Sequence, residues 1–234
     1  MNRTILSLFF IALVISCGKE KKVFLPEIEY SKISEITDVS AAYLFYNEKE
    51  VDSVEFNRRN LIGTTNWLVN VDKRLNLKQV IPHIKFLQEK KKGSKHKNEG
   101  AKSYFTCHDT SINNLGFIAF TGIVYHTEPA SDFFSEEKNK PDPIQLKANI
   151  QVNSSNNIEI MGVFDGFTSK ESTINNLIEE LKKLMENHKD TIEVVLSFSE
   201  NLSFQEYISV KSKLETLDTK QFSILKHEFI LASF

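Results

Sequence analysis

The triplet Cys107-His108-Asp109 places a thiol, an imidazole and a carboxylate next to one another, and these are the groups of a cysteine hydrolase. The surrounding run, Tyr104–His108, has the composition of a β-strand, in which neighbouring side chains point to opposite faces. Cys107 and His108 therefore cannot act on each other, and a catalytic cysteine would need a partner brought by the fold from elsewhere. We predict instead a buried, structural Cys107 beside an exposed His108.

The histidines and carboxylates do not show the spacing of a metal site or of an acid/base pair. Neither H-x-x-x-H nor H-E-x-x-H occurs, and the pairings of His126 with Glu128 and of His227 with Glu228 are too common to select a site. The sequence also lacks a G-x-S-x-G elbow and a glycine-rich phosphate loop. We therefore predict no catalytic residue, no metal and no cofactor. The histidines considered are His83, His96, His108, His126, His188 and His227.

The densest charge cluster consists of Lys90, Lys91, Lys92, Lys95, His96 and Lys97. Such a run is typical of a solvated loop, and the alternative is a surface that touches anionic headgroups or cell-wall polymers. The whole chain has 29 basic and 31 acidic side chains, and its 41% hydrophobic and 26% charged residues indicate a globular protein. This near-neutral balance gives no electrostatic footprint for nucleic acid.

The first seventeen residues determine where the protein is expected to work. Arg3 supplies a positive charge, Ile5–Ile15 is apolar apart from one serine, and Val14-Ile15-Ser16-Cys17 ends the run with a small residue and a cysteine. The apolar run is shorter than the roughly 20 residues of a spanning helix and fits the core of a signal peptide. The segment resembles bacterial lipoprotein signals, which implies cleavage before Cys17, a diacylglyceryl thioether on its sulfur and an acyl chain such as palmitate on its amino group. The alternatives are an ordinary signal peptide and a short membrane anchor.

Lipidation of Cys17 would leave Cys107 as the single free cysteine, so the mature chain could form no internal disulfide. Residues 1–16 are then the signal peptide, and residues 17–38 are a charged tether and an extended lead-in. Removal of the signal peptide takes away only Arg3 among the charged side chains, which leaves 28 basic and 31 acidic ones. Gly18 stands where an Asp would retain a lipoprotein in the inner membrane, which favours the outer membrane and a protein that faces the periplasm.

The remaining chain predicts two units separated by a linker. Residues 39–127 form the first α/β unit, with strands at Val39–Tyr46, Val51–Phe56, Asn66–Asp72, Tyr104–His108 and Gly116–His126. A loosened capping box of Asn76 and Gln79 begins its helix, although Pro82 could move the start towards itself. Residues 128–146 carry three prolines and few aliphatic side chains, as a linker does.

Residues 147–234 form the second unit, with the order β-β-α-β-α-β. Ala148–Asn153 and Ile158–Phe164 predict a hairpin, and capping boxes at Thr168–Glu171 and Ser203–Glu206 predict two helices. The first of these helices has an apolar stripe. Strands follow at Ile192–Phe198 and Phe222–Ala232. The fold class is thus α+β, with two small β-rich α/β sandwich-like units, each a sheet with helices packed on one face. The phenylalanines assigned to the core are Phe117, Phe120, Phe198, Phe204 and Phe222.

The two units also share a local pattern. Trp67–Ile81 aligns with Val194–Ile208 at a constant offset of 127 residues, and both are an alternating strand followed by a polar corner and a helix. The cap positions Asn76 and Ser203 coincide in this alignment. The pattern indicates either two related units or the coincidence of a common motif.

The second unit shows a hairpin, a helix, a strand with a polar tail, a second helix and a closing strand. Its segments are Ile150-Gln151-Val152 with Ile158-Glu159-Ile160, Thr173–Met185, Ile192–Ser199, Phe204–Leu217 and Phe222–Leu225. This order resembles the periplasmic domain of the ExbD/TolR family, small subunits of proton-driven envelope machines. Family members keep a membrane helix with an Asp near its start, whereas Ile5–Ser16 contains no acid. The resemblance therefore implies an envelope setting, self-association and contact with the cell wall or a partner protein, without proton coupling.

Together these observations predict a lipid-anchored, non-enzymatic lipoprotein of the bacterial cell envelope that acts as a binding or scaffold module, with a possible accessory role in envelope transport. Its expected partners are the membrane, through the lipid on Cys17, an envelope protein, and a second copy of the chain in a homo-oligomer. The alternatives are a hydrolase of envelope polymers with a site between the two units and a lipoprotein that binds a small ligand.

Overall fold

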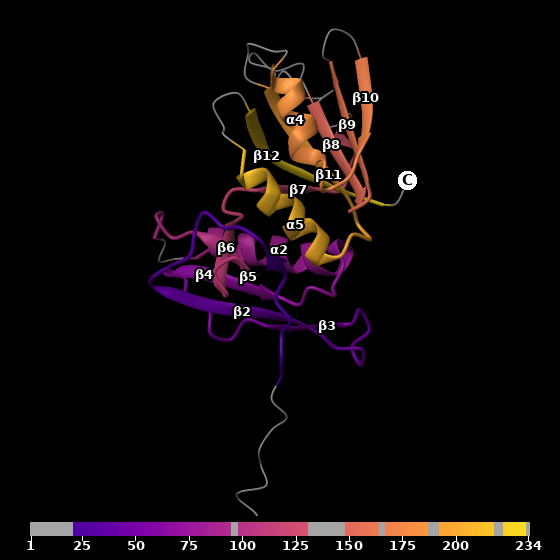
Figure 1. Cartoon of the computed structure of the whole chain (residues 1–234). Coiled ribbons are helices and arrows are strands. Elements are labelled where there is room, and N and C mark those ends of the chain that lie inside the picture. Colours follow the sequence, from indigo (N-terminus) through magenta and orange to yellow (C-terminus); the bar gives the residue numbers. More distant parts are fainter. Residues whose placement is uncertain are drawn as a thin grey trace, which may run out of the picture.

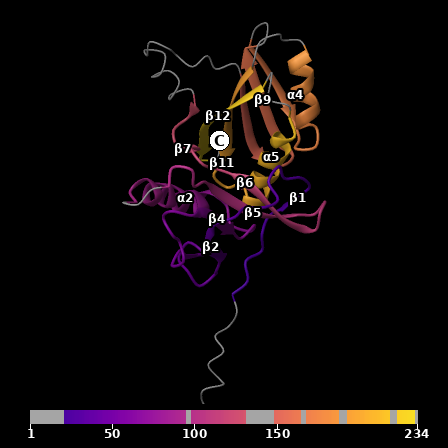
Figure 2. The same ribbon diagram turned by 90° about the vertical axis from the view of Figure 1, so that its left-hand side faces the viewer.

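The structure, a computed structural model, describes residues 21–94, 98–130, 148–163, 167–186, 192–217 and 222–232. These residues form two six-stranded mixed sheets and three helices, which confirms the predicted α+β class. Figures 1 and 2 show the two sheets towards opposite ends of the molecule, with helices α2 and α5 between them.

The first sheet has the strand order β1-β5-β4-β2-β3, and β6 also pairs with β5. Strands β2, β4 and β5 are parallel, whereas β3 and β6 run antiparallel to their partners. The short β1 comes from the predicted lead-in and pairs in parallel with the end of β5. The strands are β1 (Glu27–Ile28), β2 (Val39–Tyr46), β3 (Val54–Asn57), β4 (Asn66–Val71), β5 (Ser103–Asp109) and β6 (Asn114–Ala119).

The second sheet has the strand order β10-β9-β8-β11-β12-β7. Strands β8, β11, β12 and β7 are parallel, and β8, β9 and β10 form an antiparallel meander that begins with the predicted hairpin. The strands are β7 (Val124–His126), β8 (Ala148–Ser154), β9 (Asn157–Val163), β10 (Phe167–Ser172), β11 (Ile192–Ser199) and β12 (Phe222–Leu231).

Helix α2 (Leu77–Lys92) begins directly after Asn76, as its capping box predicts. The Asn76 side chain accepts from the backbone of Gln79, and the Gln79 side chain accepts from the backbone of Asn76. Pro82 therefore lies inside the helix and does not start it. The buried face consists of Leu77, Val80, Ile81, Ile84 and Leu87.

The capping box predicted at Thr168–Glu171 is wrong, because these residues lie in strand β10 and the next helix, α4 (Leu177–Glu186), begins later. A hydroxyl followed three residues later by a carboxylate also occurs in an edge strand such as β10. In this strand Lys170 forms an ion pair with Glu180 of α4. The box at Ser203–Glu206 is confirmed as the start of α5 (Phe204–Glu215).

The single strand predicted over Gly116–His126 is also wrong, because it divides into β6 and β7. Gly122, with a φ of 79°, turns the chain between them in a conformation that favours glycine. Strand β6 stays in the first sheet, whereas β7 pairs with β12 of the second. Residues of the predicted first unit therefore complete the second sheet.

One continuous hydrophobic core runs through both units, from Ile28 in β1 to Ile230 in β12. It contains the buried faces of α2 and α5 together with Leu177 and Leu181 of α4. All five phenylalanines assigned to the core from the sequence are buried, which confirms that prediction. Side chains from both units therefore contribute to one shared interior.

Candidate functional site at the junction of two similar units

The two units share four strands and a helix in the same arrangement. Strands β3-β2-β4-β5 of the first sheet correspond to β9-β8-β11-β12 of the second, with one antiparallel hairpin and three parallel strands in each. Helix α2 joins the last two strands of the first set, and α5 joins those of the second. This correspondence favours two related units over the coincidence of a common motif.

The corresponding corners of the two units pair with each other. Asn76 and Ser203 form an antiparallel bridge between the two helix starts. The Leu77 N–H donates to the Leu202 carbonyl at 3.0 Å, and the Phe204 N–H donates to the Leu75 carbonyl at 2.6 Å. Because each corner gives the other the same bond, the junction has the reciprocity of a twofold interface within one chain.

A second reciprocal pair lies just outside the first. The Lys78 N–H donates to the Glu200 carbonyl, and the Gln205 N–H donates to the Lys73 carbonyl. The first N–H groups of a helix have no partner within it, so here the opposite unit supplies the acceptors. The two helix starts are thereby fixed to each other by backbone bonds that do not depend on side-chain identity.

The third residue of each helix ties the junction to the hairpin of its own unit. Gln79 donates from its amide to the Asp52 carbonyl at 2.7 Å, and Glu206 accepts from the backbone and hydroxyl of Ser155. Burial raises the pKa of Glu206, but hydrogen bonds from Ser203 and Ser155 outweigh it, so the pKa lies below its ordinary value. Glu206 is therefore ionised at neutral pH and holds the hairpin against α5.

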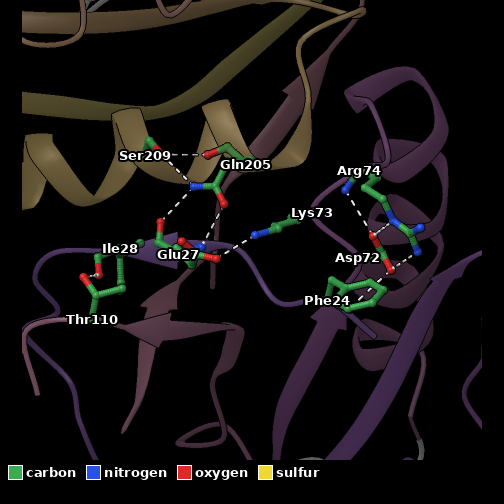
Figure 3. Close-up of polar contacts among 9 residues, drawn as sticks. All are labelled: Phe24, Glu27, Ile28, Asp72, Lys73, Arg74, Thr110, Gln205 and Ser209. Carbon is green, nitrogen blue, oxygen red and sulfur yellow. Dashed lines mark hydrogen bonds and ion pairs between the residues drawn. The ribbon is translucent and has the colours of Figure 1, made fainter. Parts of the chain in front are cut away.

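The segment that leads from the expected anchor is clamped at this junction, as Figure 3 shows. The Gln205 amide donates to the Glu27 carbonyl at 2.8 Å and accepts from the Glu27 N–H at 2.9 Å. Lys73 donates to the Glu27 carboxylate at 2.6 Å, and Thr110 donates to the Ile28 carbonyl. The segment thus bonds to both units, and its carboxylate and backbone groups have partners.

Asp72 fixes the start of the same segment (Figure 3). Its buried carboxylate accepts two bonds of 2.8 Å from the Arg74 guanidinium and one of 3.3 Å from the Phe24 N–H. Burial raises the pKa of Asp72, but the bonds from Arg74 and from the backbone outweigh it and place the pKa below 3.8. The Arg74 guanidinium also lies over the Phe24 and Tyr46 rings.

Asp72→Asn should lower the free energy of unfolding by about 1.5–3 kcal/mol at pH 7, because the charged hydrogen bonds to Arg74 are lost. The pKa of Asp72 is depressed in the folded state, so this contribution is complete above pH 3.8 and declines as the pH falls through the folded-state pKa. Urea unfolding at pH 7 and at pH about 2.5 measures the change.

The control for this prediction is Asp38→Asn, because Asp38 is exposed and Asn tolerates its φ of 51°. Asp38→Asn should change stability little at either pH. If the deficit of Asp72→Asn were equally large at both pH values, the assigned role of the carboxylate charge would be wrong.

A cavity of about 450 Å³, lined by both polar and apolar side chains, lies beside the clamped segment. Its lining residues come from β1, the start of α4 and the exposed side of α5, and the described ones include no histidine or cysteine. The Ser209 hydroxyl donates to the Gln205 carbonyl and the Ser212 hydroxyl donates to the Tyr30 carbonyl. Both hydroxyls thus donate to backbone carbonyls, which cannot act as general bases.

A second cavity of about 270 Å³, mostly apolar, lies between the end of α2 and the turn before β7. Lys91 lines it, donates to the Lys102 carbonyl and the Ser103 hydroxyl, and lies over the Trp67 ring. Burial lowers the pKa of Lys91 to about 8. Lys90, Lys91 and Lys92 form the last turn of α2, so the loop predicted for them is wrong. Lys90 and Lys92 are exposed, whereas Lys91 is half-buried.

A buried ionic network crosses the second unit. The Glu228 carboxylate on β12 accepts from the Tyr207 hydroxyl at 2.7 Å and from the Lys211 ammonium, both on α5. The Tyr125 hydroxyl on β7 lies 3.4 Å from that of Tyr207. Glu228 and both tyrosines are buried, and burial raises the pKa of each tyrosine well above 10.

The Cys107-His108-Asp109 triplet does not form a catalytic site. Cys107 is buried, and burial raises the pKa of its thiol well above the ordinary value, so it is not a nucleophile at neutral pH. His108 is half-buried, where exposure was predicted, and it hydrogen-bonds Asn113. Asp109 accepts from the backbone and hydroxyl of Ser111, which fixes the turn before β6.

Two other histidines come together across the second sheet. His126 on β7 and His227 on β12 are joined by a 2.8 Å nitrogen–nitrogen hydrogen bond, and Glu128 lies 3.0 Å from the other nitrogen of His126. The described part of the chain contains no group of three or more such side chains that could hold a metal ion. Within the same part, no helix has the length and apolar character needed to cross a membrane.

Several residues predicted to matter lie outside the described ranges: Cys17, Lys95, His96, Lys97, His188 and most of the linker at 128–146. The sequence analysis did not single out Asp72, Gln205 or Glu228, which make the long-range polar bonds of the fold. The available signal was a charged side chain next to apolar residues in β4 and β12.

Compared with known proteins, the chain matches no family model, no curated sequence and no solved structure.

Proposed function

We propose that the protein is a lipid-anchored lipoprotein of the bacterial cell envelope and acts as a non-enzymatic binding or scaffold module. The observation that supports this most is the clamp on the N-terminal segment. Only six residues separate Cys17 from Phe24, whose N–H bonds to Asp72, and Glu27 follows with bonds to both units. An anchor at Cys17 would therefore hold the folded part of the chain close to the membrane.

The cavity at the junction is the surface that we assign to a periplasmic partner. Hydroxyl, amide and charged groups line it together with apolar side chains, a mixture that suits the side chains of a protein partner. In this cavity the Ser209 and Ser212 hydroxyls donate to backbone carbonyls, which cannot act as general bases, and this is the reason for preferring binding to the hydrolase alternative. The apolar cavity beside Lys91 is the feature that a small-ligand lipoprotein would use.

Cys17→Ser should abolish incorporation of an alkyne fatty acid into the chain in a bacterial host that processes lipoproteins, and should release the protein from the membrane fraction. The matched control is Cys107→Ala. Cys107 is a buried cysteine, so its substitution should leave the labelling unchanged. Equal labelling of Cys17→Ser and the parent chain would contradict the anchor.

In-cell crosslinking of the tagged full-length chain, followed by mass spectrometry, tests the scaffold role. We expect envelope proteins at near-stoichiometric yield, and loss of these crosslinks in Asn175→Arg, which places a long side chain in the junction cavity from an exposed position. Recovery of the chain alone, in cells where Cys17 is labelled, would overturn the scaffold role and leave the anchor intact.

A further inference from the structure

The two units differ in the segment that connects the hairpin to the next parallel strand. In the second unit, β10 and α4 connect the hairpin to β11, and Figure 1 shows α4 on the same side of the sheet as α5. In the first unit, residues 58–65 make the corresponding connection from β3 to β4 without a helix. In the first unit, the face of β3 on the side of α2 is therefore not covered by a second helix, whereas α4 covers the corresponding face of the second sheet.

Aromatic rings line this open position. The Phe56 ring on β3 lies 4.8 Å from the His83 ring and 6.3 Å from the Phe86 ring, both on α2. The Arg58 guanidinium lies 4.6 Å from the centre of the Phe86 ring. Phe86 is 41% exposed, so an apolar side chain faces solvent where the second unit has a helix.

Cations surround these rings. A polar cavity of about 550 Å³ is lined by Lys21, Arg58, Arg59 and Lys90 together with Glu55, Phe56 and Asn57. Its one carboxylate, Glu55, is already paired with Lys21. Four cations and one anion thus meet here in a chain whose formal net charge is −2. We name Lys21, Phe56, Arg58, Arg59, Phe86 and Lys90 the basic aromatic surface.

The expected anchor brings this surface to the membrane, and this step rests on the proposed function. Three residues separate Cys17 from Lys21, and the four steps of chain between the two reach at most roughly 14 Å. Lys21 forms part of the basic aromatic surface and pairs with Glu55 on β3. In Figure 1 the first unit lies at the end of the molecule where the described chain starts, and the second unit lies at the other.

We propose that the basic aromatic surface docks on the anionic phospholipid headgroups of the membrane that holds the lipid on Cys17. Cations close to such a membrane are attracted by its negative surface potential, and an exposed aromatic ring among them can enter the headgroup region. Docking would place the first unit against the membrane and direct the second unit and the junction cavity away from it. The acyl chains on Cys17 would supply the attachment, and the basic aromatic surface would orient the protein on the membrane.

The test uses the chain from Gly18 onwards, which retains every described residue and carries no lipid. We expect it to co-sediment with vesicles of phosphatidylglycerol and phosphatidylcholine at low salt, to bind pure phosphatidylcholine weakly, and to dissociate in 0.5 M salt. Arg58→Glu with Arg59→Glu should lower binding at least tenfold. Lys182→Glu with Lys226→Glu makes the same change in net charge at exposed positions of the second unit and should leave binding unchanged.

The proposal would be overturned by no preference of the parent chain for anionic vesicles, or by equal loss of binding in both double variants. Loss of crosslinks to an envelope protein in Arg58→Glu with Arg59→Glu, without vesicle binding by the parent, would assign the surface to a protein and also overturn it. Circular dichroism of both variants confirms folding. Fatty-acid labelling of Cys17 is measured in a separate experiment. Absence of the lipid anchor and absence of membrane docking by the basic aromatic surface therefore give different results.

Discussion

Glu228→Ala should lower the free energy of unfolding by about 3–5 kcal/mol, because it leaves a buried cation without its partner. The Glu228 carboxylate is fully buried and accepts from Lys211, whose side chain is only 12% exposed, and from the Tyr207 hydroxyl. After the substitution Lys211 must either lose its proton or expose its surroundings to water. Urea unfolding followed by circular dichroism at pH 7 measures the loss.

Substitutions of Lys211 separate the effect of the unpaired charge from the effect of lost packing. Lys211→Met alone leaves a buried carboxylate and should cost a similar amount, whereas Lys211→Met with Glu228→Leu should cost much less than the sum of the two single changes. The control is Glu179→Ala, which breaks an exposed ion pair with Lys183 and should change stability by less than about 1 kcal/mol. Additive losses in the double variant would show that the two groups do not act as a pair.

The elements that could be predicted from the sequence are those whose signals are local. Strand β2 has the predicted bounds, Val39–Tyr46, because a run of β-formers is bounded by turn residues on both sides. The capping boxes at Asn76 and Ser203 are confirmed because each needs only residues three positions apart. The offset of 127 residues also identified two corners that the structure places opposite each other.

The elements that could not be predicted depend on distant contacts. Nothing local says that β6 and β7, five residues apart, belong to different sheets, because that division is decided by pairing with β12 about 100 residues later. The same limit applies to the polar network, in which Tyr125 and Tyr207 meet across 82 residues. Thr168–Glu171 fitted a capping box, but pairing with β9 outweighed that local preference.

The continuity of the core leads to a prediction about how the two units unfold. Phe204 is fully buried at the start of α5, and its ring lies 5.1 Å from that of Phe105 in the first sheet. Phe105 also stacks on Phe120 and approaches Tyr207, so a cluster of rings from both units fills the junction. Phe204→Ala should therefore lower the free energy of unfolding by about 3–5 kcal/mol, the usual cost of such a cavity.

Two probes show whether that loss is shared between the units. The chain has one tryptophan, Trp67 in the first unit, so its fluorescence follows the unit that does not contain the substitution. We expect urea midpoints from Trp67 fluorescence and from circular dichroism to coincide in the parent chain and to shift together in Phe204→Ala. Ile112→Ala, at an exposed turn, should shift neither. An unchanged Trp67 transition in Phe204→Ala would mean that the units unfold independently. The reciprocal backbone bonds of Leu77 with Leu202 and of Phe204 with Leu75 would then not couple them.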